Sequence, residues 1–222
     1  MSRIAALLLL AFSTNASALE LTERLIRLDR ELTIPHAAKV AEELFKLDAA
    51  GREPIVLVVA TRSGFVPAAM VLVDAIGAVE SPVFALIQPE AFGVGALVAA
   101  FCDKRYAFPN SAVLVSKLEY EAEKVMKDSP PLPAAAAETY VARIYELYAK
   151  RLGLKPAELR TRAEAGWFLT AEDAKAAGFV TDVVDRVAWT ELVVETVEVK
   201  RTATVKAKRP ALDAKDPLEG TK

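Results

Sequence analysis

The chain has 222 residues, a formal net charge of −2, one cysteine and one histidine. A single cysteine excludes an intramolecular disulfide and argues against a zinc cluster, so we expect no metal and no other cofactor. The near-neutral charge gives no reason to expect nucleic acid as a partner. Cys102 lies in an apolar stretch and is expected to be a buried thiol. Any reaction that needs an imidazole depends on His36.

The N-terminus has the order of a secretory signal peptide. Arg3 is followed by an apolar run from Ile4 to Phe12 and then by small residues that end at Ala18. This order predicts cleavage after Ala18 and a periplasmic or secreted protein. The apolar run is shorter than the roughly 20 residues that cross a bilayer, so we expect no membrane span after cleavage.

Between residues 25 and 187, short β-rich runs alternate with helical ones, which predicts βα units around a largely parallel sheet. The expected elements in chain order are a strand at 25–28, a helix at 35–50, a strand at 55–60, a turn at 61–65, a helix at 66–76, a strand at 83–87, a turn that feeds a short buried helix ending at 101, a strand at 112–115, a mobile loop at 119–133, a long helix at 134–152, a helix that starts in the capping box 170–173 and stops at 178, and a strand at 179–187. Residues 1–18 are thus assigned to the signal peptide and 19–190 to one domain. Residues 191–222 form a C-terminal extension that is expected to be disordered at its end.

Two helices have clear apolar faces. The predicted core side of the helix at 35–50 carries Val40, Ala41, Leu44, Phe45 and Leu47. The long helix presents Tyr140, Ile144, Leu147 and Tyr148. Because Tyr140, Tyr145 and Tyr148 cannot all face the core of their own domain at helical spacing, we expect this helix and its surroundings to mediate self-association.

Two sequence segments carry a family resemblance. Residues 104–111 read Lys-Arg-Tyr-Ala-Phe-Pro-Asn-Ser, and residues 167–180 read Trp-Phe-Leu-Thr-Ala-Glu-Asp-Ala-Lys-Ala-Ala-Gly-Phe-Val. With the matching order of strands and helices, the stretch from Glu23 to about Val187 resembles the proteolytic subunit of Clp proteases. The resemblance implies an α/β fold, a ClpP/crotonase-like layered βαβ spiral with a largely parallel sheet and flanking helices.

The family's functional positions follow by counting from these segments. The catalytic serine of the family falls on Gly93, its histidine on Ser116 and its aspartate on Gly166. A triad needs an imidazole to take the serine proton and a carboxylate to orient the ring, so the resemblance implies that the catalytic triad is missing. The oxyanion loop of the family falls on residues 61–65. Within this loop, Ser63 and Gly64 are the equivalents of the oxyanion-binding residues. Val94, which follows the nucleophile position, is the third equivalent.

The leading hypothesis is a catalytically inactive pseudo-peptidase that acts as an exported binding or scaffolding subunit. The resemblance implies a homo-oligomer with a peptide or protein as its ligand. We expect no Clp ATPase as a partner, because the mature chain would begin close to its first strand and an exported protein meets no ATP. In the family, a glycine-rich segment joins two rings of subunits. Residues 119–124 replace that segment here, which argues against a double ring.

Two enzymatic alternatives stay open. One is a serine peptidase with a relocated nucleophile, Ser63 or Ser116, activated by Lys117. Neighbours on a strand point to opposite faces, which leaves Ser63 as the partner for Lys117. The other is a crotonase-type acyl enzyme, in which the N–H groups of Gly64 and Gly95 stabilise an enolate and Glu90 is the base. His36 is expected at a helix start, remote from the groove.

Overall fold

Continuous apolar runs form the parallel main sheet. The computed structural model describes residues 18–120 and 132–189. Its main sheet has the order β2-β3-β4-β6-β9 and is parallel throughout. The strands are β2 (Leu25–Leu28), β3 (Ile55–Val59), β4 (Val83–Ile87), β6 (Lys104–Ala107) and β9 (Asp182–Val183). All five residues of β3 are buried, as expected for a strand covered on both faces.

Two smaller sheets flank the main one. In the first, β5 (Glu90–Phe92) runs parallel to β7 (Ala112–Val115), and β7 is antiparallel to β8 (Trp167–Thr170). In the second, β1 (Ala18–Leu21) pairs in parallel with β10 (Arg186–Trp189). Leu19 and Leu21 of β1 pack on Val56, Val58 and Leu86 in a small core of their own. The main sheet is therefore apolar on both faces.

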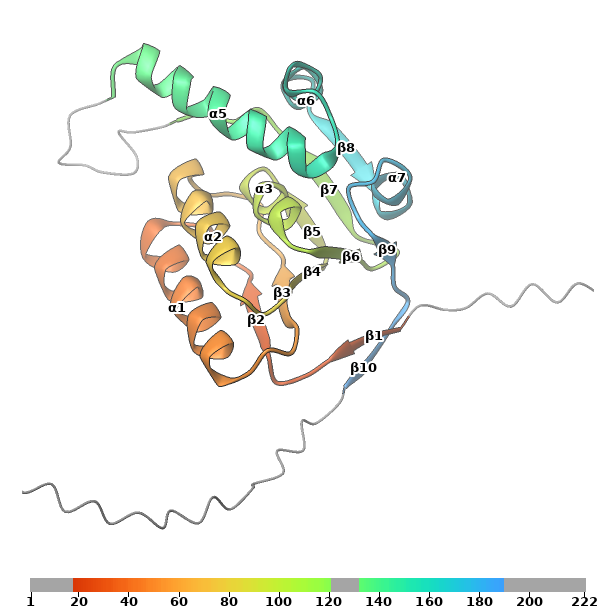
Figure 1. Ribbon diagram of the computed structural model, residues 1–222. Helices are drawn as coiled ribbons and strands as arrows, with labels where there is room; N and C mark the ends of the chain where they lie inside the picture. The colour runs from red at the N-terminus through yellow and green to blue at the C-terminus, as the bar shows by residue number, and fades with distance from the viewer. Residues whose placement is uncertain (1–17, 121–131, 190–222) are drawn as a thin grey trace, which may run out of the picture. The chain divides into compact units, whose positions relative to one another are not determined.

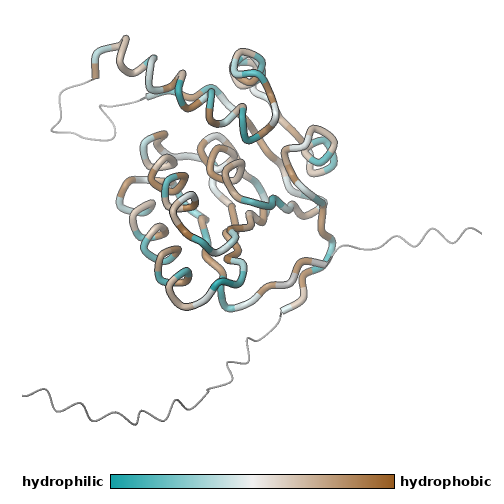
Figure 2. The backbone as a smooth tube through the Cα atoms, viewed as in Figure 1, coloured by the Kyte–Doolittle hydropathy of each residue, from teal (hydrophilic) through white to brown (hydrophobic). Residues whose placement is uncertain are grey.

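The helices are α1 (Ile34–Ala50), α2 (Val66–Ala78), α3 (Val94–Phe101), α5 (Ala134–Leu152), α6 (Pro156–Glu164) and α7 (Ala171–Ala176). Figure 1 shows α1, α2 and α3 side by side along the main sheet, with α5 running across the top. Figure 2 shows apolar residues gathered on the central strands and hydrophilic residues on the outer turns of the helices. The expected fold class, mixed α/β with a mostly parallel central sheet and flanking helices, is confirmed.

Several predicted elements are confirmed to within two residues, among them the strands at 25–28, 83–87 and 112–115 and the helix at 134–152. The capping box is also confirmed, because Thr170 Oγ1 accepts a hydrogen bond from the Asp173 N–H. The strand predicted at 179–187 is wrong in its extent, since only 182–183 and 186–189 are extended. The strands β1, β5, β6 and β8 and the helix α6 were not predicted, because these elements are short or rich in charged residues.

Two predictions about helix faces are wrong. Phe45 is 48% exposed instead of facing the core. In α5, Tyr145 and Tyr148 are both buried, and Tyr140 packs against the core beside Tyr120. The tyrosines can share the interior because α5 is covered from Tyr140 onward by α3, α6 and the segment after β7. These tyrosines therefore provide no reason to expect self-association through α5.

A buried polar cluster lies at the amino ends of the main-sheet strands. The guanidinium of Arg24 donates to the carbonyl oxygens of Leu47, Gly51 and Glu53 and to Ser81 Oγ. Ser81 Oγ in turn donates to Asp48 Oδ1 at 2.8 Å. The cluster therefore caps the C-terminal carbonyls of α1, and it ties that helix to β2 and β4.

The predicted signal peptide, the predicted disorder after residue 191 and most of the predicted loop at 119–133 lie outside the described residues. The first described strand begins at Ala18, the residue that precedes the predicted cleavage point. Among the described helices, none combines the length and the apolar character that crossing a bilayer requires.

Candidate functional site

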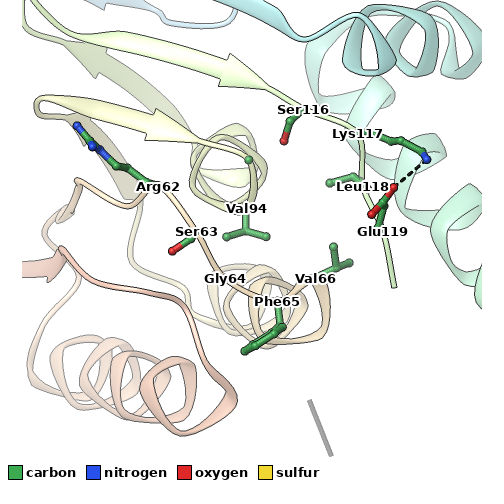
Figure 3. Close-up of a pocket in the computed structure, with 11 residues that line it drawn as sticks. Arg62, Ser63, Gly64, Phe65, Val66, Val94, Ser116, Lys117, Leu118 and Glu119 are labelled. Carbon is green, nitrogen blue, oxygen red and sulfur yellow. Dashed lines mark hydrogen bonds and ion pairs between the residues drawn. The ribbon is translucent and has the colours of Figure 1, made fainter. Parts of the chain in front are cut away.

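The carboxyl ends of β3, β5 and β7 meet around a cavity of about 230 Å³. Pairing brings them together, because Phe92 of β5 donates to the Thr61 carbonyl after β3 and Gly93 donates to the Leu114 carbonyl of β7. The cavity is lined by Arg62, Ser63, Gly64, Phe65, Val66, Gly93, Val94, Ser116, Lys117, Leu118 and Glu119 (Figure 3). Side chains carried by three separate loops thus share one concave surface.

Gly93 occupies a sharp turn between β5 and α3. Its backbone angles are φ 53° and ψ −112°, a conformation that residues with a side chain rarely adopt. A strand, a strained turn residue and a helix that begins immediately afterwards make up the elbow that presents the nucleophile in many hydrolases. At Gly93 this elbow presents only a backbone, so it has no group that attacks a carbonyl.

Ser116 is the nearest neighbour of the elbow. A Cβ added to Gly93 would lie 3.2 Å from Ser116 Oγ, with no other heavy atom within 4 Å among those compared. The positions expected for the nucleophile and for its base are therefore adjacent in space. A serine hydroxyl is not basic enough to accept a proton near neutral pH, so Ser116 does not serve as the base.

The contacts of Lys117 do not favour a role in activating a serine. Its Nζ donates to Glu119 Oε1 at 2.8 Å, and this hydrogen bond raises the pKa of the ammonium group above its ordinary value. Figure 3 shows the Lys117 side chain directed toward Glu119, on the opposite side of the cavity from Ser63. A lysine general base needs a lowered pKa and contact with the serine, and Lys117 has neither.

The back wall of the cavity is a tightly packed loop. Leu32 donates to the Ser63 carbonyl and accepts from the Phe65 N–H, so the two hydrogen bonds enclose Gly64. A Cβ on Gly64, whose φ is 152°, would lie 2.6 Å from the Leu32 carbonyl oxygen. In the described residues, the N–H groups of Gly64 and Val94 donate to no protein acceptor. They remain free to bind a ligand oxygen, as an oxyanion hole does.

The crotonase-type set is not assembled around this cavity. Glu90 pairs with Arg62 in a close ion pair and does not line the cavity. Gly95 is buried behind it, where an added Cβ would lie 2.7 Å from Thr61 Cγ2. The base and one of the two donors of that alternative therefore face other groups.

The remaining sequence candidates lie elsewhere. Gly166 directly precedes β8, with φ 73°, and is not a lining residue. His36 is partly buried at the start of α1, where its backbone N–H donates to the Thr33 side chain. Cys102 is fully buried, and burial raises the pKa of its thiol to about 12. No group of acidic, histidine or cysteine side chains in the described ranges is arranged to hold a metal ion.

Sequence reasoning missed the apolar and hydrogen-bonded parts of the cavity. Leu118 lines it beside Phe65 of the expected loop, and the Leu118 N–H donates to Tyr145 Oη at 3.1 Å. The tyrosine thereby anchors the segment that carries Ser116 and Lys117. The only signal in the sequence was the apolar character of Leu118 next to two charged residues.

Comparison with known proteins gives one family and one fold. The Clp protease family matches residues 12–187. Among solved structures, a ClpP1 mutant from Listeria monocytogenes superimposes with a TM-score of 0.64 at 19% sequence identity. The match covers 73% of this chain and 92% of that chain. At this identity the structural likeness defines the fold alone.

Proposed function

The chain belongs to the Clp protease family, and we propose that it is a member without peptidase activity that uses the cavity to bind a peptide or protein. The observation that carries this proposal is the elbow at Gly93, which keeps its backbone shape but has no nucleophile. Its neighbour Ser116 provides no base, and Lys117 is held by Glu119. Loss of a serine-protease triad costs on the order of 10⁶ in rate.

The binding role is supported by what the cavity retains. Two backbone N–H groups, at Gly64 and Val94, are available to a carbonyl or carboxylate oxygen. Phe65 and Leu118 add apolar surface next to them. Polar groups beside an apolar wall are typical of binding sites, and these features support a peptide or protein as the ligand.

The proposal includes export and self-association. Export is supported by the order of Arg3, the apolar run and Ala18. N-terminal sequencing of the protein from its native host tests export, and a chain that starts at Met1 in the cytosol would contradict it.

Self-association is supported by Phe92, Leu114 and Phe168, which lie in register on the outward face of the β5-β7-β8 sheet. Phe168 is 56% exposed, and apolar rows of this kind mark interfaces. Light scattering is expected to give an oligomer that Phe168→Asp dissociates and Phe45→Asp leaves intact.

The central test combines peptide turnover with labelling by a fluorophosphonate. The natural chain is expected to show neither. The triple variant Gly93→Ser, Ser116→His and Gly166→Asp is expected to be labelled, whereas the matched triple variant with Gly93→Ala is not. Turnover by the natural chain that Ser63→Ala abolishes would replace this proposal with the relocated-nucleophile mechanism.

Binding is tested separately with unfolded, fluorescein-labelled casein as the probe. Fluorescence anisotropy is expected to report binding to the natural chain and at least tenfold weaker binding to Phe65→Glu. Phe45→Glu is the matched control, because it places the same charge on α1 away from the cavity. Equal binding by all three proteins would exclude the cavity as the binding site.

A further inference from the structure

A second cavity lies at the amino ends of β4 and β6, whereas the candidate site lies at the carboxyl ends of other strands. Its volume is about 710 Å³, and its lining comes from the end of α2, the start of β4, the connection from α3 to β6 and the end of α5. This cavity is called the β4-β6 groove here. Its size is that of a site for a small organic molecule.

The floor of the groove is apolar and recessed. It consists of Val73, Ile76, Val79, Pro82, Phe84 and Phe101. Val73 and Ile76 are 8% and 7% exposed, and the two phenylalanines are half-buried, whereas the charged side chains of the rim are exposed. A groove of this shape suits the chain of a single bound molecule, because an anchor in a membrane needs apolar side chains that project.

Two cations of the rim lie over aromatic rings and have no carboxylate partner in the described part of the chain. Lys104 Nζ lies 5.3 Å from the centre of the Phe84 ring. The guanidinium carbon of Arg151 lies 5.8 Å from the centre of the Phe101 ring. Nε and Nη2 of Arg151 donate to carbonyl oxygens of residues 100–102, which leaves Nη1 without an acceptor among the described residues. The rim can therefore bind an anion beside the apolar floor.

The two acidic residues of the lining already have partners. Glu80 forms an ion pair with Arg52 at 3.1 Å, and Asp103 Oδ2 accepts a hydrogen bond from the Val83 N–H at 2.8 Å. Neither carboxylate therefore offsets the positive charge of Lys104. This arrangement favours an anionic ligand over a cationic one.

The backbone around the groove disfavours a polypeptide as the occupant. The N–H groups of Val79, Ser81 and Asp103 all donate to acceptors within the protein. Pro82 has no N–H group. A peptide along the groove would thus find no backbone donor at these four positions, whereas an alkyl chain needs none.

We propose that the β4-β6 groove binds a single-chain amphiphilic anion, such as a fatty acid. The alkyl chain lies on the apolar floor, and the carboxylate accepts hydrogen bonds from Lys104 and Arg151. This function goes beyond the peptide site proposed at Gly93 and does not depend on it, because the two cavities share no lining residue.

The size of the groove is tested by isothermal titration calorimetry of the full chain with monomeric decanoate. Saturable binding is expected, with no binding of decyltrimethylammonium, which has the same chain length and the opposite charge. A Cβ on Gly77 would meet no atom within 4 Å among those compared, so Gly77→Leu places its side chain in the open groove. This variant is expected to bind decanoate about tenfold more weakly. Ala78→Leu, outside the lining, is the matched control and is expected to bind as the natural chain does.

A second pair of variants tests the charge. Lys104→Glu is expected to weaken decanoate binding about tenfold. Lys39→Glu, which reverses an exposed charge on α1 outside the groove, is expected to leave binding unchanged. Circular dichroism checks that each variant is folded.

Vesicles of phosphatidylglycerol distinguish a membrane from a free amphiphile as the source of the anion. The protein is expected to stay in the supernatant when these vesicles are sedimented. Three results would each overturn the proposal. They are no saturable binding of decanoate, equal decanoate affinity in the natural chain, Gly77→Leu and Lys104→Glu, and binding to the vesicles without binding to decanoate.

Discussion

The back wall and the front of the cavity both contain glycine, but for different reasons. At the back, Gly64 of the lining and Gly95 behind the lining lie against Leu32 and Thr61, so closely that a Cβ would come within 2.6 Å and 2.7 Å of them. At the front, a Cβ on Gly93 would meet only Ser116 Oγ, at 3.2 Å. Packing demands the first two glycines, whereas only backbone conformation demands the third.

This difference shows which parts of the site are fixed by packing and backbone hydrogen bonds. The back wall is fixed by hydrogen bonds between Leu32 and the loop at 63–65, and it carries the Gly64 N–H, which donates to no acceptor among the described residues. The front consists of Gly93 and Ser116, which fill little space and have no acid–base chemistry near neutral pH. The elbow at Gly93 thus keeps its backbone turn without a side chain on it.

The largest expected effect is that of Gly64→Ala at the back wall. The substitution combines a positive φ with a clash against the Leu32 backbone, and we expect it to lower the free energy of unfolding by about 3 to 5 kcal/mol. Urea denaturation measures it. Gly77→Ala in α2 is the matched control, since its Cβ meets no atom and alanine favours the helix. Equal effects would show that the back wall is not tightly packed.

Gly93→Ala is expected to have a smaller effect, a loss of about 1 to 2 kcal/mol. Only the strained backbone conformation opposes the methyl group, because Ser116 Oγ can rotate away. The same denaturation experiment measures this loss of free energy of unfolding. Adding Ser116→Gly to Gly93→Ala is expected not to relieve the loss, because the loss comes from the backbone conformation. A loss as large as that of Gly64→Ala would remove the contrast between the two walls.

Thr61→Val examines the polar support of the back wall. The Thr61 hydroxyl lies 2.7 Å from the Arg30 carbonyl oxygen and is buried. Valine keeps the shape but removes the donor, and we expect the free energy of unfolding to fall by about 1 kcal/mol. Thr161→Val on the exposed side of α6 is the control. A change within the error of the control would show that the hydroxyl contributes nothing.

The smallest expected effect is that of Lys117→Gln at the front. Its ion pair with Glu119 is exposed to solvent, so we expect no measurable change in the urea midpoint at pH 7. Because the pair raises the pKa of Lys117 in the folded state, any stabilisation is present below the unfolded pKa and is lost as the pH rises through the folded pKa. A clear loss of stability at pH 7 would indicate that the front is built as firmly as the back.

Much of the fold could be predicted because its signals are local. The apolar run at 55–60 and the periodic helix at 134–152 define their elements by sequence spacing alone. The capping box at Thr170 is equally local. The short strands β5, β6 and β8 have no such signal, because pairing with neighbours that are distant in sequence makes them extended.

For the candidate site, the family resemblance led us to expect the reacting positions at Gly93, Ser116 and Gly166. It could not say which of these positions share a cavity, and the structure groups Gly93 with Ser116 but leaves Gly166 outside the lining. It also could not reveal that Lys117 pairs with Glu119, nor that Tyr145 is buried and holds Leu118. Those facts depend on how loops after different strands approach one another, and only the packed tertiary structure determines that approach.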